Sequence, residues 1–464
     1  MRFLKISLAA SIALGAFSTA SFAQPLEEAI KGVDVSGFLR YRYTDDRYDN
    51  ADHIQDDLGD SNARHQWRAQ ADFKTPTINN IALNLGIGYH NPSQNVNHGK
   101  GSPANTNTAP LNGLGGGLGA GKDSDFGVTQ FYMTITPDST ATTIFLGKQR
   151  LGTPVTDALD DRATGILALN SDIPGLTLAA GAFDSWSLDD LGLTELGTEG
   201  SVDKPLYTIA AIYNTDTGIG NIGAQVWGFM VDDLVDTLIY SELSWKHSLL
   251  NANLQYGYAS LSDDPTDLTY GLASDNDLLN LKVGANFKQD FGIPLDMNVG
   301  YVTNFQDSTT VAFDDEGNYS SVYAGQIWWE TNAVGATIGL GQNLNGLGQN
   351  LNWPRQTLRQ EETDLSVFYG ALKYGFLDDR LTIGLEGVYG KIEKTAKEAF
   401  ATYAAGETTW KKKFTEITPT FAWQHNKNLR ISGYYAILNT QDDLTPNRPD
   451  EDRNRARVEV KYSF

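Results

Sequence analysis

Apolar and polar residues alternate along much of the chain, and the last eight residues show the alternation most clearly. One face of that segment carries Val458, Val460, Tyr462 and Phe464, and the other carries Arg457, Glu459, Lys461 and Ser463. A period of two predicts a β-strand. Residues 33–43 and 280–288 repeat the pattern over about ten residues, the length that a tilted strand needs to cross the hydrocarbon layer of a membrane. A charged row must face water, so the apolar row faces either lipid or a second sheet.

The lengths of the connections distinguish lipid from a second sheet, because transmembrane barrels alternate short turns with longer external loops. Short links lie at 137–141, 171–175, 247–250, 290–294, 376–380 and 426–428, and long polar stretches at 44–61, 91–125, 185–205, 262–276, 306–363, 391–412 and 440–452. We therefore predict an all-β fold, a transmembrane antiparallel β-barrel of about 18 strands with long external loops. Apolar runs at 322–329 and 333–340 leave one further pair of strands open, and Pro419 counts against regular pairing of its own strand.

The first 23 residues have the features of a secretory signal peptide. Arg2 and Lys5 precede a largely apolar stretch at 6–17, and Ser21-Phe22-Ala23 is typical of a cleavage site. A membrane anchor is the alternative, but the apolar stretch has about 12 residues where a spanning helix needs roughly 20. We predict a signal peptide at 1–23 and one barrel at 24–464, because no Pro-rich, Ser-rich or charge-block linker divides the remainder.

Charge and cysteine content exclude several classes of function. The chain has 57 Asp and Glu against 35 Lys and Arg, a formal net charge of −22. Nucleic acid is therefore not an expected partner, because neutralising its phosphates needs clustered Lys and Arg. The absence of cysteine excludes a disulfide framework and Cys-ligated metals.

Two features that are typical of enzymes are weak in this sequence. GGLGAGK at 116–122 matches part of a phosphate-binding loop, but Asp123 stands where Ser or Thr is required. A barrel phospholipase would need a Ser–His pair on its lipid-facing surface. Trp67 follows His65 on the outward row, however, and His247-Ser248 lies in a short turn. We predict that the protein is not an enzyme.

Both ends and much of the first half of the chain resemble one known family. The similar stretches are PLEEAIKGVDVSGFLRYRYTD at 25–45, GKQR at 147–150 followed by Thr156-Asp157, GLTLAAGAFDSW at 175–186, and the terminal Tyr462-Ser463-Phe464. They resemble the major outer-membrane porins of Campylobacter and related epsilonproteobacteria. The resemblance implies an 18-stranded general porin in a Gram-negative outer membrane, in contact with lipid and lipopolysaccharide. It also implies a homotrimer and a third external loop folded into the lumen; the middle and late loops diverge from the family.

The loop at 151–165 is the candidate for the pore constriction. It follows the fifth predicted strand, and it carries Asp157, Asp160 and Asp161 beside Arg162. The charges that line a constriction determine which solutes pass. The alternative is an ordinary solvated acidic loop.

Positive charge, opposite to that of the acidic loop, lies on the first two predicted strands and the last. These strands are neighbours if the barrel closes by pairing its ends. Their inward rows contain Arg40, Arg42, Arg64, Arg68, Arg457 and Lys461. We call these residues the basic wall. We predict that the wall faces the acidic loop and sets up a transverse field that orients polar solutes. The alternative is that these cations are structural and pair with carboxylates on nearby strands.

The clustered carboxylates also raise a calcium hypothesis, because calcium prefers several oxygen ligands. Asp161 aligns with an acidic pore position of the resembled family, and Asp314 aligns less closely with the partner of that position. The resemblance therefore implies a calcium ion in the pore at Asp161 and Asp314. Residues 313–317 lack the spacing of an EF-hand, and no feature of the sequence requires a cofactor.

Three functions remain open at the level of the sequence. The first is a general diffusion porin for small hydrophilic solutes and ions, cation-preferring because acidic residues are in excess. The second is a substrate-specific channel of similar architecture, for acidic amino acids or sugars. The third is a surface adhesin that uses long loops such as 306–363.

Overall fold

The structure, a computed structural model, describes most of the predicted barrel. The described residues are 32–48, 62–97, 126–156, 161–187, 204–263, 272–313, 324–328, 361–397, 409–442 and 452–464. The strands in chain order are β1 (Asp34–Tyr48), β2 (Asn62–Lys74), β3 (Ile81–Asn97), β4 (Phe126–Ile135), β5 (Thr142–Arg150), β6 (Arg162–Ile173), β7 (Leu176–Ser187), β8 (Leu206–Thr217), β9 (Gly220–Val231), β10 (Val235–Lys246), β11 (Leu250–Leu261), β12 (Asp275–Asn286), β13 (Leu295–Thr303), β14 (Glu361–Phe376), β15 (Leu381–Ala396), β16 (Thr409–Gln424), β17 (Leu429–Asp442) and β18 (Arg453–Ser463), and the described helix is α4 (Lys288–Phe291). The predicted signal peptide lies outside the described residues.

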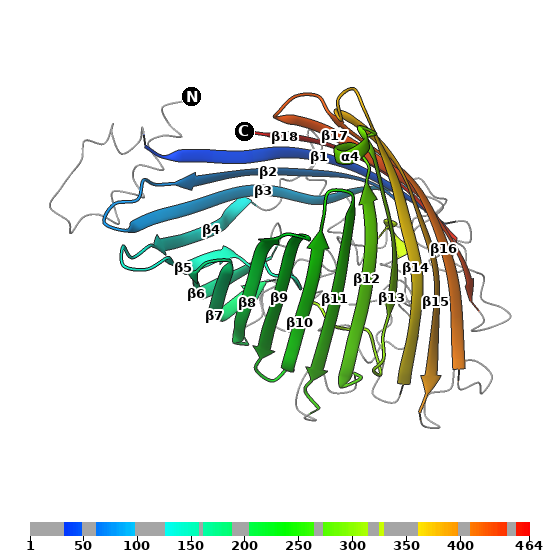
Figure 1. Cartoon of the computed structure of the whole chain (residues 1–464), viewed down its shortest axis with the longest axis horizontal. Coiled ribbons are helices and arrows are strands. Elements are labelled where there is room, and N and C mark those ends of the chain that lie inside the picture. Colours follow the sequence, from blue (N-terminus) through cyan, green and yellow to red (C-terminus); the bar gives the residue numbers. More distant parts are fainter. Residues whose placement is uncertain are drawn as a thin grey trace.

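The strands form a closed barrel, because β1 pairs with both β2 and β18 (Figure 1). Each strand is antiparallel to its neighbours in the chain, so the predicted fold of about 18 strands is confirmed. Phe464 completes the seam by exchanging two backbone hydrogen bonds with Gly37, each with an N···O distance of 3.0 Å. A Cβ on Gly37 would come within 2.8 Å of the Phe464 ring and 2.2 Å of the Gln70 carbonyl oxygen, so the close approach at the seam requires glycine.

Side-chain exposure follows the predicted alternation, with apolar residues on the outside and polar residues on the inside. On β1, Leu39 is 54% exposed whereas its neighbour Arg40 is only 8% exposed. On β16, Ile417 is 56% exposed and Glu416 only 1%. This arrangement reverses that of a soluble protein, and it is stable where hydrocarbon covers the outer surface and water fills the interior.

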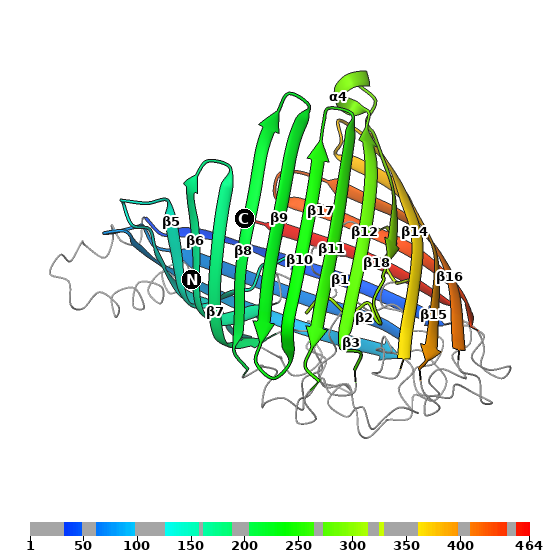
Figure 2. The same ribbon diagram turned by 60° about the horizontal axis from the view of Figure 1, so that its bottom comes forward.

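Short turns gather at one end of the barrel, together with α4 (Figure 2). The predicted short links all lie there, and β2 and β3 join at the same end through Asn79 and Asn80, whose φ angles of 51° and 69° allow a tight turn. The opposite end carries the longer connections, with the exception of residues 232–234 between β9 and β10. Following the usual orientation of such barrels, we call the first end periplasmic and the second external.

The structure describes two features that the sequence left open, the pairing around Pro419 and the number of strands between β13 and β14. Pro419 lies in β16 and is skipped by the ladder with β17, which pairs Ile417 with Ile437 and Thr420 with Tyr434 in one unbroken register. The connection between β13 and β14 adds no strand in its described parts, 304–313 and 324–328. In the described part of the chain, no helix is long and apolar enough to span a membrane.

Candidate functional site

Four cations line up across neighbouring strands on the inner face of the barrel. The register places Arg40 opposite both Lys461 of β18 and Arg68 of β2. Lys461 is in turn opposite Arg430 of β17. We call this row the cation rung. Opposed like charges repel each other, so the rung costs stability, and local costs of this kind are typical of functional sites.

The ring of Phe38 supports two members of the cation rung. Lys461 Nζ lies 4.6 Å from the centroid of this ring, and Arg68 Cζ lies 5.8 Å from it. A cation over the face of an aromatic ring is attracted to the ring's negative face. Phe38 therefore fixes two of the cations without neutralising them.

Glu459 partly neutralises the basic wall one position nearer the external end. Its Oε2 lies 3.0 Å from Arg42 Nε and 4.0 Å from Arg40 Nε. Arg42 therefore pairs with a carboxylate on a neighbouring strand, as the alternative interpretation of the wall predicted. Glu459 is one carboxylate beside two arginines, so it does not by itself neutralise both.

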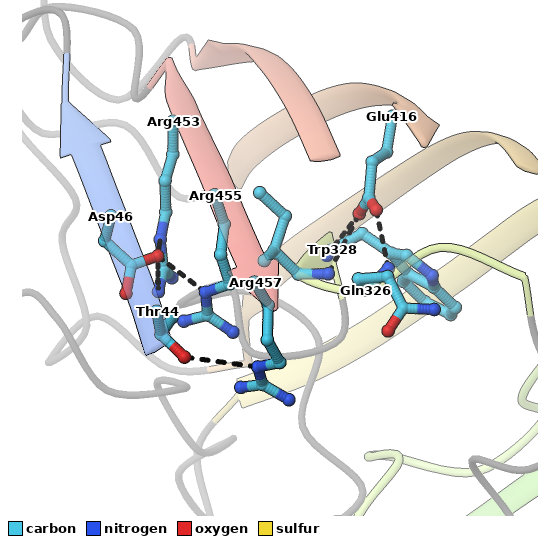
Figure 3. Close-up of polar contacts among 9 residues, drawn as sticks. Thr44, Asp46, Gln326, Trp328, Glu416, Arg453, Arg455 and Arg457 are labelled. Atoms are coloured by element: carbon cyan, nitrogen blue, oxygen red, sulfur yellow. Dashed lines mark hydrogen bonds and ion pairs between the residues drawn. The ribbon is translucent and has the colours of Figure 1, made fainter. Parts of the chain in front are cut away.

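A buried ion network of Asp46, Arg453 and Arg455 lies next to the basic wall, on its external side (Figure 3). Asp46 Oδ1 accepts hydrogen bonds from Arg455 Nε at 2.6 Å and from Arg453 Nε and a terminal nitrogen at 3.1 and 3.0 Å. All three side chains are at most 10% exposed. Next to them, Arg457 Nε donates to the Thr44 hydroxyl at 3.3 Å. This network rigidifies the joint between β1 and β18.

Three cations of this inner surface were not predicted from the sequence. Arg453 and Arg455 share the inward row of β18 with Arg457, and Arg430 faces Lys461, so the same alternation could have identified them. Of the predicted wall, Arg40, Arg42, Arg68, Arg457 and Lys461 are all inward on adjoining strands. The backbone of Arg64 lies on β2 in the predicted position, and its side chain is outside the described residues.

The external end of the β5–β6 hairpin leaves the barrel wall. The ladder between β4 and β5 stops at Lys148, just beyond Gly147, whose φ of 127° permits a sharp bend. Beyond this point, hydrogen bonds from two side chains take the place of the backbone bonds between β4 and β5. Lys148 Nζ donates to the Val128 carbonyl and Arg162 Nε to the Thr129 carbonyl, both at 2.9 Å. The two cations thus pin a bent hairpin to β4.

The hairpin tip packs inside the barrel. Leu151 donates its amide to the Asp161 carbonyl at 3.1 Å, and Val155 belongs to the same buried cluster as the inward-facing Trp186. Asp161 is fully buried and Arg162 is 6% exposed. The structure therefore places the described part of the predicted acidic loop inside the lumen. The predicted members Asp157 and Asp160 lie outside the described residues.

Asp72 connects the wall strands to the inner hairpin. Its carboxylate lies 2.8 Å from a terminal nitrogen of Arg150 on β5 and accepts hydrogen bonds from Gln70 and Gln130 at 3.0 to 3.2 Å. Gly86 lies between these side chains, where a Cβ would come within 2.7 Å of Asp72 Oδ1. The sequence analysis did not select Arg150, although GKQR was one of the stretches that carried the resemblance.

The connection between β13 and β14 also enters the lumen and contacts two separate parts of the inner wall. Phe313 packs edge-on against Trp186 of β7 and Phe229 of β9, with ring centroids 5.3 and 5.9 Å apart, and its amide donates to the Val155 carbonyl at 2.9 Å. Residues 324–328, which we call the luminal segment, lie instead against β15 and β16. The sequence analysis left the packing of this connection open.

The calcium hypothesis stays a prediction. Asp161 is described, but Asp314 lies outside the described residues. Within the described ranges, no three His, Asp or Glu side chains gather in a way that could hold a metal ion.

Three comparisons relate the chain to known proteins. A family model described as "Campylobacter major outer membrane protein" matches residues 1–462. The comparison with curated proteins gave no match. Similar solved structures include Acinetobacter baumannii OccAB4 (14% identity, TM-score 0.58, 93% of this chain and 98% of that chain covered). They also include a BenF-like porin from Pseudomonas fluorescens Pf-5 (16%, 0.57, 93% and 99%) and Pseudomonas aeruginosa OccK2 in complex with glucuronate (14%, 0.56, 93% and 98%). At these identities the structures share the fold alone.

Proposed function

Because the chain belongs to the Campylobacter major outer membrane protein family, whose members are outer-membrane porins, we propose that it is a general diffusion channel for small hydrophilic solutes and ions. The observation that carries this proposal is the closed barrel of 18 strands with polar inward rows. Barrels of this size are wide enough to leave a water-filled channel. Two connections that fold inward narrow it.

We further propose a transverse field in the narrowed region. The basic wall lies on β18, β1 and β2, and the inward hairpin carries Asp161, which is buried inside the barrel. Opposed charges across a water-filled constriction orient polar solutes and disfavour apolar ones. The role of Asp157, Asp160, Asp161 and Arg162 at the constriction is part of this proposal.

The proposed preference for cations rests on charge outside the wall. The chain has a formal net charge of −22, and residues 44–61, which include the connection from β1 to β2, contain seven aspartates and one arginine. An acidic mouth raises the local concentration of cations. Reversal potentials in a salt gradient test this preference, and a preference for chloride would overturn it.

Planar bilayer recording tests the channel itself. Purified protein should give discrete conductance steps, and the flux of neutral sugars through proteoliposomes should rise in proportion to their concentration. Absence of steps would contradict the channel proposal, and the adhesin hypothesis would then be preferred.

The cation rung supports a second candidate, a channel specific for anionic solutes. Arg40, Arg68, Arg430 and Lys461 form a row of adjacent cations that could bind a carboxylate. One solved structure with the same fold, OccK2, is in complex with glucuronate. Saturable block of the ion current by glucuronate, but not by glucose, would favour this candidate over a general porin.

The remaining expectations are proposals with simple tests. We propose a homotrimer that contacts lipid and lipopolysaccharide, which native mass spectrometry of the detergent-extracted protein would test. N-terminal sequencing of the exported protein would test cleavage after Ala23. Calcium titration of the wild type against Asp161→Asn would test the ion at Asp161 and Asp314.

A further inference from the structure

The luminal segment is held by a carboxylate that reaches it from the barrel wall. Glu416 of β16 accepts hydrogen bonds from three consecutive backbone amides, those of Gln326 at 2.5 Å, Ile327 at 3.1 Å and Trp328 at 2.7 Å (Figure 3). The Thr418 hydroxyl donates a fourth bond at 2.6 Å. Both carboxylate oxygens are thereby used, and three amides of an irregular segment gain a partner.

A second carboxylate binds the start of the same segment. Glu386 Oε2, on the neighbouring strand β15, accepts from the Gly325 amide at 3.0 Å and from Gln326 Nε2 at 3.1 Å. Its other oxygen lies 3.4 Å from Lys373 Nζ of β14. Glu386 and Glu416 therefore hold one short segment from two adjacent strands.

Aromatic packing completes the attachment. The Trp328 ring stacks on the Phe414 ring with centroids 5.8 Å apart, and its Nε1 donates to the Ala324 carbonyl at 2.7 Å. A Cβ on Gly325 would come within 2.8 Å of Val388 Cγ2, so Val388 lies directly beneath the segment. Trp328 is 1% exposed and Val388 5%.

These contacts attach the β13–β14 connection to β15 and β16, and the same connection is attached to a second part of the barrel. The same β13–β14 connection is anchored at Phe313 on β7 and β9, so its two described parts lie against inner surfaces several strands apart. The position of the connection in the lumen then depends on both anchors. A carboxylate costs free energy when it is buried without partners, and Glu416, 1% exposed, accepts the three amide hydrogen bonds only while the segment is docked.

We propose that Glu416 and Glu386 are positioning residues that latch the luminal segment to β15 and β16 and thereby fix the width of the pore. This proposal rests on the proposed channel function. The latch needs no ordered helix or strand, because the two carboxylates satisfy the backbone amides that secondary structure would otherwise satisfy. Released from the latch, the segment exchanges these bonds for bonds to luminal water.

Single-channel recording tests the latch. Glu416→Ala should replace the steady open level of each pore by several conductance levels, because the connection then adopts more than one position; conductance levels are counted per pore. Thr418→Val, which removes one hydrogen bond and keeps the charge, should do so to a smaller degree. The matched control is Glu242→Gln, which removes a carboxylate of β10 that bonds Tyr240 and Gln255 and does not touch the segment; it should keep a single level.

Thiol labelling gives a readout that does not depend on conduction. The chain has no cysteine, so Val388→Cys introduces a unique thiol beneath Gly325. A charged methanethiosulfonate should label this thiol roughly tenfold faster or more in the Glu416→Ala background, because the loss of even one of the three charge-assisted hydrogen bonds to the segment is expected to give a shift of about this size. In the Glu242→Gln background the labelling rate should not change. Heat-modifiable gel migration identifies the variants that form the barrel.

The outcomes separate the latch from the channel. A single wild-type conductance level and an unchanged labelling rate in Glu416→Ala would overturn the latch and leave the channel proposal intact. The opposite outcome is also informative. If the wild type gives no conductance steps but Glu416→Ala labels faster, the channel proposal and the effect on pore width are contradicted. The attachment of the segment by Glu416 would then still stand.

Discussion

Asp46 holds the two most external arginines of β18, so its neutralisation should cost much of the stability of the barrel seam. Asp46→Asn keeps the shape of the side chain and removes its charge. In the wild type, Asp46 Oδ1 accepts three hydrogen bonds, one from Arg455 Nε and two from Arg453, and the Asp46 side chain is 2% exposed. The amide would remove the negative charge that Asp46 supplies to two buried guanidinium groups.

The magnitude follows from the burial of the pair. Breaking a buried ion pair by removing one partner costs about 3–5 kcal/mol, because an uncompensated charge remains. Since Arg453 is 10% exposed and can reach luminal water more easily than Arg455 at 3%, we expect Asp46→Asn to lower the free energy of unfolding by about 3 kcal/mol.

Reversible urea unfolding in lipid or detergent, followed by tryptophan fluorescence, measures this loss as a shift of the midpoint at constant slope. The control is Lys288→Ala, which removes an ion pair with Asp379 in which the two side chains are 58% and 37% exposed. It should leave stability nearly unchanged, since exposed ion pairs contribute little. A loss below about 1 kcal/mol for Asp46→Asn would refute the inference that the network is a buried and stabilising one.

Three further predictions concern selectivity and packing. Asp161→Asn should weaken the cation preference measured by reversal potential, and unchanged selectivity would remove Asp161 from the constriction. Arg68→Gln should strengthen the cation preference in the same assay, because it removes one charge from the cation rung; a shift toward chloride would contradict the proposed role of the rung. Gly390→Ala should destabilise the barrel by about 1–3 kcal/mol in urea unfolding, because its Cβ would fall 2.0 Å from the Phe414 ring; wild-type stability would mean that Phe414 can move at little cost.

The strands were predictable because each one is specified locally. A membrane barrel places apolar side chains outward and polar ones inward at every second position, so alternation in one segment states both its conformation and its orientation. The facing of Leu39, Arg40, Val458 and Lys461 followed from this pattern and is confirmed. The positions of the short turns followed from the same segments, since little sequence separates the strands that they join.

The inward connections were less predictable, because tertiary contacts decide their positions. The bend after Gly147 depends on Lys148 and Arg162 reaching carbonyl groups of β4, and the luminal segment depends on Glu416, about 90 residues further along the chain. No periodic signal marks such contacts. The resemblance implied an inward loop, and the described residues 151–156 and 161–165 pack inside the barrel, whereas nothing in the sequence predicted the inward position of residues 304–313 and 324–328.

The register separates the charges of the basic wall into two zones along the pore axis. At the external end, Asp46 partly neutralises Arg453 and Arg455, whereas the four cations of the rung face one another and Glu459 approaches the rung at Arg40, with 4.0 Å between its Oε2 and Arg40 Nε. Asp46 and Arg40 are six residues apart on β1, which corresponds to about 20 Å at the usual rise of a strand. Charges in water are screened over about 8 Å at physiological ionic strength, so the two zones act on a solute one after the other. The proposed cation preference of the mouth and the proposed anion binding at the rung are therefore compatible in one pore.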